Sequence, residues 1–215
     1  MATTDGGILS PFSGKVGTVI GVVRKKGKQI IRKIPSPSSK PRSLKQLAQN
    51  NKMKLLAPFF VDMKEFLAVS FKQEGDKREL DGYNTAKSEN LKTGIKGVYP
   101  NQEIDWTGIV ISKGTRAIPE KVTVTAIENG FELEWGEDFD IINGSIYDRT
   151  VLVIYFPEHK YSYSDICGSR RSALKETFNI PVKKFKGKEA HIYLAFKDIH
   201  TFEISNSLYC GSHYF

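Results

Sequence analysis

The chain begins with a segment whose hydrophobic residues favour extended structure. Residues 18–24 and 29–34 are rich in Val and Ile, and Lys25-Lys26-Gly27-Lys28 lies between the two runs. Gly27 can adopt the positive φ of a tight turn, so this pattern predicts a β-hairpin. Residues 35–42 contain three prolines and three serines, which predicts an extended linker after the hairpin.

Helical spacing replaces this pattern from Ser43 onward. Ser43 and Gln46 form a capping-box signature, and the apolar positions that follow recur on one face of a helix. Pro58 lies inside this pattern, so we expect a kink or a division of the helix near residues 56–57. A second, shorter helix is predicted over residues 81–93, which makes two or three helices in all. Core packing explains both apolar stripes better than a ligand pocket does.

The apolar positions alternate with a period of two from residue 104 onward. This alternation predicts seven strands, at residues 105–112, 121–127, 131–135, 150–156, 174–180, 189–196 and 202–208. Glu128-Asn129-Gly130 is a strong hairpin turn between the second and third of them. In the sixth strand Ala190, Ile192, Leu194 and Phe196 alternate with His191, Tyr193 and Ala195, which predicts one buried face and one face with polar or aromatic groups.

These elements predict an α+β protein in three zones. The first zone is the hairpin and its linker, residues 1–42, and the second is a helical segment, residues 43–103. The third is residues 104–215, where short strands at regular spacing predict an antiparallel β-sandwich.

Two groups of motifs resemble known families. Residues 119–207 include Glu132-Leu133-Glu134-Trp135 and His191-Ile192-Tyr193-Leu194-Ala195-Phe196, and this segment resembles a fibronectin type III-like or immunoglobulin-like sandwich. The order of Gly14-Lys15-Val16-Gly17, the helix start Lys40-Pro41-Arg42-Ser43 and the closing Ser205-x-Ser207 resembles a family of uncharacterised bacterial proteins. The opening is also similar to that of phage-associated structural proteins, although Lys40 and Ser43 replace the expected Asn and Thr. The resemblance implies an architecture and no catalytic residues.

Composition adds a strong asymmetry of charge. The 215 residues form one large domain or two small ones, with 40% hydrophobic and 26% charged residues, as is ordinary for a globular protein. Residues 1–54 contain twelve Lys and Arg against Asp5 alone, a net charge of +11, whereas the whole chain has +8. The remaining residues therefore have −3. The basic N-terminal region needs an anionic partner or an exposed position.

The sequence also indicates in which cellular compartment the protein is expected. No stretch approaches the 18 apolar residues of a membrane span, and residues 1–10 have no features of a secretory signal. Cys167 and Cys210 are too few for a disulfide scaffold. We therefore expect a cytoplasmic protein or a component of an assembled particle.

Residues with catalytic or metal-binding patterns are few. The four histidines lack metal-ligand spacing, no phosphate-binding glycine loop occurs, and no serine lies in a nucleophile-elbow motif. Glu132 and Glu134 alternate with core positions, so we expect both on an exposed strand face rather than as an acid/base pair. We expect no catalytic residue, no cofactor and no metal, and therefore a protein that is not an enzyme.

The charge distribution suggests self-association instead. Residues 128–140 contain six carboxylates and no Lys or Arg, so the basic hairpin of one copy could dock on this region of another copy. Such a head-to-tail contact closes into rings or continues as filaments. The unpaired edges of the hairpin could also extend the sheet of a neighbour. The expected interface consists of Val19, Ile20, Val22, Val23, Arg24, Lys25, Lys26, Lys28, Ile30, Ile31, Arg32, Lys33, Glu132, Glu134, Glu137 and Asp138.

Three alternatives stay open. A hairpin alone is marginally stable, so this one could simply fold back on its own chain. The basic residues of the hairpin could neutralise nucleic-acid phosphates, in which case affinity would fall steeply with salt. A peptide or carbohydrate adhesin would use Tyr155, Tyr161 and Tyr163, but the missing export signal counts against it.

Overall fold

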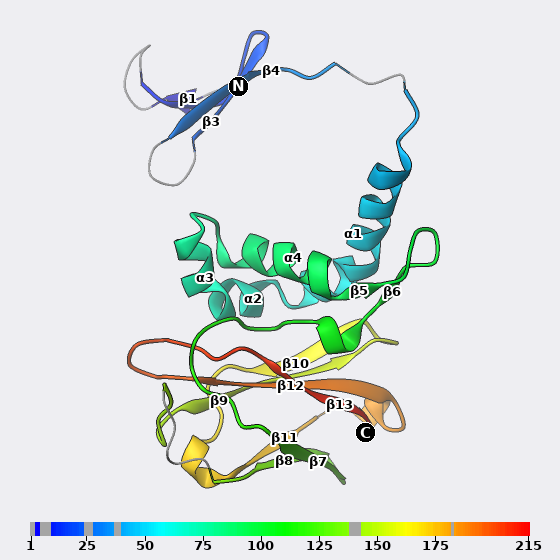
Figure 1. Cartoon of the computed structure of the whole chain (residues 1–215), viewed down its shortest axis with the longest axis vertical. Coiled ribbons are helices and arrows are strands. Elements are labelled where there is room, and N and C mark those ends of the chain that lie inside the picture. The colour runs from blue at the N-terminus through cyan, green and yellow to red at the C-terminus, as the bar shows by residue number, and fades with distance from the viewer. Residues whose placement is uncertain (1–2, 5–9, 24–27, 37–39, 138–142, 182) are drawn as a thin grey trace. The chain divides into compact units, whose positions relative to one another are not determined.

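The computed structural model describes all residues except 1–2, 5–9, 24–27, 37–39, 138–142 and 182. The chain divides into two compact units, Met1–Ser43 and Leu44–Phe215. The expected mixed α+β class is confirmed, with an N-terminal antiparallel sheet, four α-helices and several antiparallel sheets toward the C-terminus (Figure 1).

The first unit is an antiparallel sheet of order β1-β2-β3-β4. Its strands are β1 (Thr3–Thr4), β2 (Phe12–Val16), β3 (Val19–Val23) and β4 (Gln29–Lys33). The hairpin expected from the two apolar runs is present as β3 and β4, with Val19 paired to Lys33 and Val23 to Gln29. β2 was not expected, because Phe-Ser-Gly-Lys-Val contains a glycine and only two apolar residues. It joins β3 through Gly17, whose φ of +55° favours glycine.

The second unit begins with four helices. These are α1 (Leu44–Asp62), α2 (Lys64–Ser70), α3 (Lys72–Lys77) and α4 (Gly82–Thr93). The helix start after Ser43 is confirmed, whereas of the expected kink or division near residues 56–57 the division does not occur. α1 continues through Pro58, and the break between α1 and α2 falls at Met63. α4 begins as expected, because the Asp81 carboxylate accepts a hydrogen bond from the backbone N–H of Asn84 at 2.8 Å.

Two larger antiparallel sheets follow. The central sheet has the order β10-β9-β12-β13 and consists of β9 (Arg149–Phe156), β10 (Tyr161–Asp165), β12 (Glu189–Lys197) and β13 (Leu208–Tyr214). The outer sheet has the order β11-β8-β7 and consists of β7 (Val122–Ile127), β8 (Gly130–Trp135) and β11 (Lys175–Asn179). A two-stranded ladder joins β5 (Ile95–Lys96) to β6 (Glu103–Ile104), and short 3-10 turns lie at Trp106–Gly108, Arg171–Ala173 and Lys183–Phe185.

The central sheet is covered on both faces (Figure 1). One face packs on the helices, where Val151, Val153 and Tyr155 meet Phe59 and Met63. The opposite face packs on the outer sheet through a second hydrophobic cluster that includes the other residues of β9 and β12. The face of β12 that has the polar or aromatic groups is buried as well: Tyr193 and Ala195 pack in the cluster with the helices, and His191 stacks on Trp106.

Two predicted strands are misplaced. Residues 105–112 contain a 3-10 turn followed by an extended segment without a ladder, because the Asn90 side chain binds both the backbone N–H and the C=O of Val110, each at 2.8 Å. The last strand begins at Leu208 instead of Phe202. Only isolated bridges precede it, and the Ser205 hydroxyl accepts a hydrogen bond from the backbone N–H of Phe196.

Candidate functional site

The N-terminal sheet, β1 to β4, is the candidate site, and its strands display two different faces. Strand alternation and register place Phe12, Val16, Val19, Val23 and Ile31 on one face. The other face has Lys15 opposite Ile20, with Ile20 opposite Arg32 and Val22 opposite Ile30. Both faces thus combine branched aliphatic residues with polar or basic ones.

Close packing inside this sheet occurs at a glycine. Gly21 lies opposite Gly14 on β2 and Ile31 on β4, and the Phe12 ring lies over it. A Cβ at Gly21 would come within 2.4 Å of the Phe12 ring. The aromatic ring therefore replaces the side chain that the glycine lacks, which stabilises the pairing of β2 with β3.

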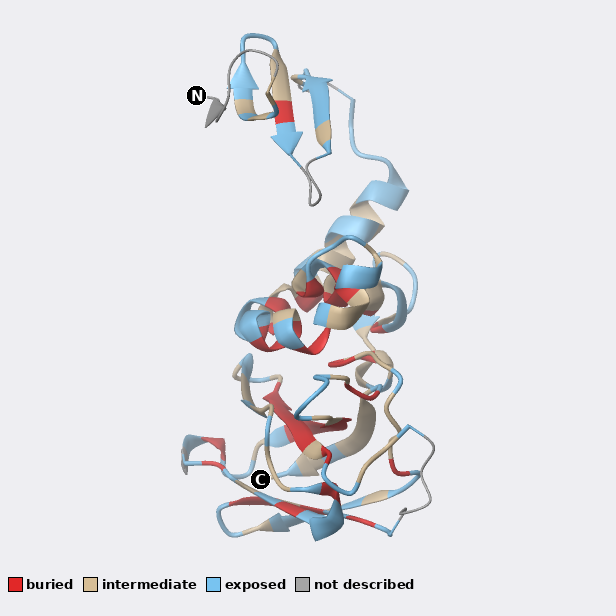
Figure 2. Ribbon diagram, turned by 90° about the vertical axis from the view of Figure 1, so that its left-hand side faces the viewer, coloured by how far each residue is buried: buried red, intermediate tan, exposed pale blue. Residues whose placement is uncertain are grey.

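The N-terminal sheet has no hydrophobic core within its described residues. Gly21 is its only buried position, whereas every buried hydrophobic side chain in the described chain belongs to the second unit (Figure 2). Five aliphatic side chains are exposed, namely Val16 (50%), Val22 (40%), Val23 (40%), Ile30 (38%) and Ile31 (56%). Exposed aliphatic residues on both faces of one sheet are typical of a surface that a partner covers.

The net charge of the protein is concentrated in this unit. Residues 1–43 contain nine Lys and Arg and one Asp, a net charge of +8, so residues 44–215 have a net charge of zero. Lys15, Lys28, Arg32 and Lys33 are exposed on the described part of the sheet. Two N-terminal sheets of this kind repel each other, and both are attracted to an acidic surface.

The expected interface residues fall into two groups, one in each unit. Val19 and Ile20 are half-buried in β3, and the other described members from the N-terminal sheet are exposed. Arg24, Lys25, Lys26 and Asp138 lie outside the described residues. Phe12 and Val16 belong to the same aliphatic face but were missed, although their alternation around Gly14 was a signal.

The acidic group lies on and beside β8, in the outer sheet. Glu132 is half-buried, and Glu134 and Glu137 are exposed, while Phe131, Leu133 and Trp135 point into the core as expected. On this face Glu132 is paired with Thr125 of β7 and Thr177 of β11, and its carboxylate lies 3.7 Å from the Lys175 ammonium.

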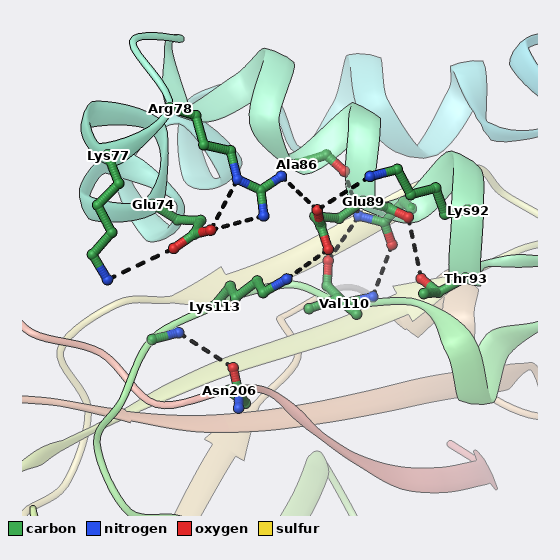
Figure 3. Close-up of polar contacts among 12 residues, drawn as sticks. Glu74, Lys77, Arg78, Ala86, Glu89, Lys92, Thr93, Val110, Lys113 and Asn206 are labelled. Atoms are coloured by element: carbon green, nitrogen blue, oxygen red, sulfur yellow. Dashed lines mark hydrogen bonds and ion pairs between the residues drawn. The ribbon is translucent and has the colours of Figure 1, made fainter.

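A different polar cluster joins the helices to the segment after them (Figure 3). Glu89 on α4 binds the Lys113 ammonium at 2.7 Å and the Arg78 guanidinium at 2.6 Å, and Arg78 also contacts Glu74. The hydrogen bond from Lys113, with that from Arg78, lowers the pKa of Glu89 to about 2. Every carboxylate in this cluster has a cationic partner, so its chemistry is that of a structural link.

A second cluster surrounds Arg116 beside the central sheet. Its guanidinium binds the carboxylate of Asp148, which is buried, at 2.7 Å, and it also binds Asp198. The neighbouring Arg171 is buried, donates to the Ala117 carbonyl at 2.9 Å and lies over the Phe196 ring. These contacts hold together the loops that contain Arg116, Asp148 and Asp198.

The aromatic cluster around His191 is likewise internal. The imidazole stacks on Trp106 with ring centroids 4.3 Å apart, and its Nδ1 lies 2.8 Å from the Tyr209 hydroxyl. Burial lowers the pKa of His191 to about 4, so the ring is neutral at pH 7. Tyr193 donates its hydroxyl hydrogen to the Trp106 carbonyl at 2.9 Å, which completes the packing against the helical layer.

The described residues contain neither a metal-binding cluster nor a membrane-spanning helix. No group of three or more His, Cys, Asp and Glu side chains converges there in a way that could hold a metal ion. Among the helices of the described chain, none combines the length and the apolar character needed to cross a bilayer.

Comparisons with known proteins identify the family of this chain. No significant match was found among curated proteins or among solved structures. A protein-family model matches residues 11–211, which include β2 to β4 of the N-terminal sheet, all four helices and both larger sheets except the end of β13. That match carries no link to phage proteins and no fibronectin type III-like or immunoglobulin-like domain. The chain therefore belongs to DUF6266, a family of unknown function.

Proposed function

We propose that this protein is a non-enzymatic assembly protein that self-associates through its N-terminal sheet. A filament, a ring and a phage-like particle are the forms we propose for the assembly. On this view, the unit Leu44–Phe215 is the body of each subunit, and its two hydrophobic clusters give it a core of its own.

The observation that carries the proposal is the absence of a core in the described part of the N-terminal sheet. Full burial of a Val or Ile side chain is worth roughly 1.5–3 kcal/mol, so covering a half-exposed one contributes about 1 kcal/mol. Five such side chains lie on the two faces. A protein surface that covers them supplies the stabilisation that a small single-layer sheet lacks on its own.

Nucleic-acid binding is the second candidate, because nine Lys and Arg residues lie within residues 1–43. Phosphates would neutralise this charge but would leave the aliphatic side chains in water. Base stacking needs exposed aromatic rings, and the aromatic ring in the described part of this sheet, Phe12, is half-buried over Gly21. Protein association accounts for both the charge and the aliphatic faces, so we favour it.

The experiment compares the full chain with a variant that lacks residues 1–40, by light scattering and negative-stain microscopy at low and high salt. We expect the full chain to form species larger than the 24.2 kDa monomer and the truncated chain to remain monomeric. High salt should shift the full chain toward monomer because it screens the basic sheet from its acidic partner.

The opposite result would contradict the proposal. If both proteins are monomers in every buffer, self-association through the N-terminal sheet is wrong. Duplex DNA and single-stranded RNA then become the next ligands to test, with the salt dependence of affinity as the readout.

A further inference from the structure

The outer edge of β7 is unpaired in the part of the chain that the structure describes. β7 is the last strand of the outer sheet, and its ladder runs to β8 alone. β13 comes near β7, but no backbone hydrogen bond joins the two among the described residues. An edge strand of this kind presents free N–H and C=O groups to another strand.

The register of the β7–β8 hairpin identifies which backbone groups point outward. A two-residue loop makes Ile127 and Gly130 a hydrogen-bonded pair, and such pairs alternate along the ladder. Trp135 fits this alternation, because its N–H donates to the Leu174 carbonyl on the side of β8 away from β7. Val122 is the β7 residue paired with Trp135, so its backbone N–H and C=O point away from β8. The same holds for Val124 and Ala126, because the direction alternates along the strand.

β7 also lacks the features that protect other sheet edges from unwanted pairing. Edge strands are commonly protected by charged residues, proline, a bulge or very short length. Among the described edges, β11 has Lys175, β10 has Asp165, the β12–β13 ladder contains a register shift, and β1 has two residues. β7 has six residues, Val-Thr-Val-Thr-Ala-Ile, and none of these protections.

The edge strand β4 complements β7 in length and in charge. Within the described residues, β4 pairs with β3 alone; it has five residues and ends in Arg32 and Lys33. Behind the edge of β7 lie Glu132 and Glu134 on the adjacent strand. Arg32 and Lys33 lie on opposite faces of β4, so an added β4 places one of them on the face of Glu132 and Glu134. Two strand spacings are about 10 Å, a distance that this Arg or Lys side chain can largely span.

We propose that β4 of one copy adds to the outer edge of β7 in a second copy of this chain. The two edges are different surfaces, so the contact is head-to-tail and each subunit both donates and accepts a strand. Pairing of β4 with another β4 is disfavoured, because both strands are basic. This inference rests on the proposed function and adds the surface that receives the N-terminal sheet.

The test removes one outward N–H from the edge of β7 in the full chain. Ala126 is exposed, and it lies four residues after Val122, so its backbone N–H also points away from β8. Ala126→Pro therefore deletes an N–H donor at the edge and spares the hydrogen bonds of the ladder with β8. The matched control, Ala126→Val, keeps the donor. We expect Ala126→Pro to raise the concentration for half-assembly by about tenfold or more, and Ala126→Val to behave as the unmodified chain.

Charge reversal tests the same contact without proline. Glu132→Lys with Glu134→Lys should weaken assembly, and adding Arg32→Glu with Lys33→Glu to the same chain should restore it. If Ala126→Pro has an unaltered circular dichroism spectrum and assembles normally, the proposal is wrong. If that variant does not fold, the charge pair decides, and unchanged assembly of the Glu132→Lys/Glu134→Lys chain overturns the proposal.

The outcome separates this inference from the proposed function. Loss of assembly on deletion of residues 1–40, with normal assembly of the β7 and charge variants, rejects the β7 edge and keeps the proposed function. A full chain that is monomeric at all concentrations rejects both.

Discussion

At the residue scale, His191 makes the stability of the body depend on pH. Its folded pKa of about 4 lies below the ordinary value of 6.5, because burial disfavours the imidazolium. The neutral ring thus contributes its full stability above pH 6.5, and this contribution is lost as the pH falls toward 4. The expected loss is on the order of 3 kcal/mol.

Urea unfolding followed by fluorescence between pH 7 and pH 4 measures this dependence. His191→Phe removes the titrating group and should flatten the curve in this range, whereas His200→Gln, at an exposed loop position, should leave it unchanged. Equal pH dependence in the unmodified chain and in His191→Phe would show that other groups control acid stability.

A second residue-scale prediction concerns Asn90 on α4. Its side chain is fully buried and satisfies both backbone groups of Val110, so Asn90→Ala leaves two partly buried backbone groups without these partners. We expect a loss of about 2–4 kcal/mol in the free energy of unfolding. Asn84→Ala, on the exposed side of the same helix, is the matched control, with an expected loss of about 1 kcal/mol or less. Equal losses would contradict the role of Asn90.

At the element scale, β9 and β12 should be the most stable strands. They pair with each other at the centre of the central sheet, and both of their faces are buried. Hydrogen exchange followed by mass spectrometry should find their amides the slowest to exchange. The amides of β2 to β4 should exchange fastest in dilute protein and should become protected as the concentration, and with it assembly, increases. Slow exchange of β2 to β4 in dilute protein would contradict this prediction.

The elements also show what the sequence pattern could and could not predict. The β7–β8 hairpin was predictable because Glu128-Asn129-Gly130 is a strong local turn signal between alternating segments. The burial of both faces of β12 was not predictable, because the polar and aromatic side chains of His191 and Tyr193 do not reveal which layer packs on them. The sequence pattern predicts a strand at Val110, because an apolar run does not reveal that a side chain, rather than a neighbouring strand, forms the hydrogen bonds with its backbone.

At the scale of the whole molecule, the candidate site was predictable in part. The charge asymmetry and the β3–β4 pairing followed from composition and local pattern. The absence of a core in the described N-terminal sheet could not be predicted, because an alternating run predicts a strand but not the layer that packs on it. Exposure of Ile31 and Val16 is a property of the complete fold, and it is the basis of the assembly proposal.

The lack of a hydrophobic core in the described N-terminal sheet affects how unassembled subunits are degraded. If partner binding supplies the stability of the N-terminal sheet, an unassembled subunit exposes a basic, trypsin-sensitive segment, whereas the body retains its own core. Proteases would then remove this segment from surplus subunits first and leave bodies that cannot donate a strand. Inactivation of surplus subunits would therefore need no dedicated factor, because the sheet that joins the subunits is also the segment that proteases cleave first when a subunit is unassembled.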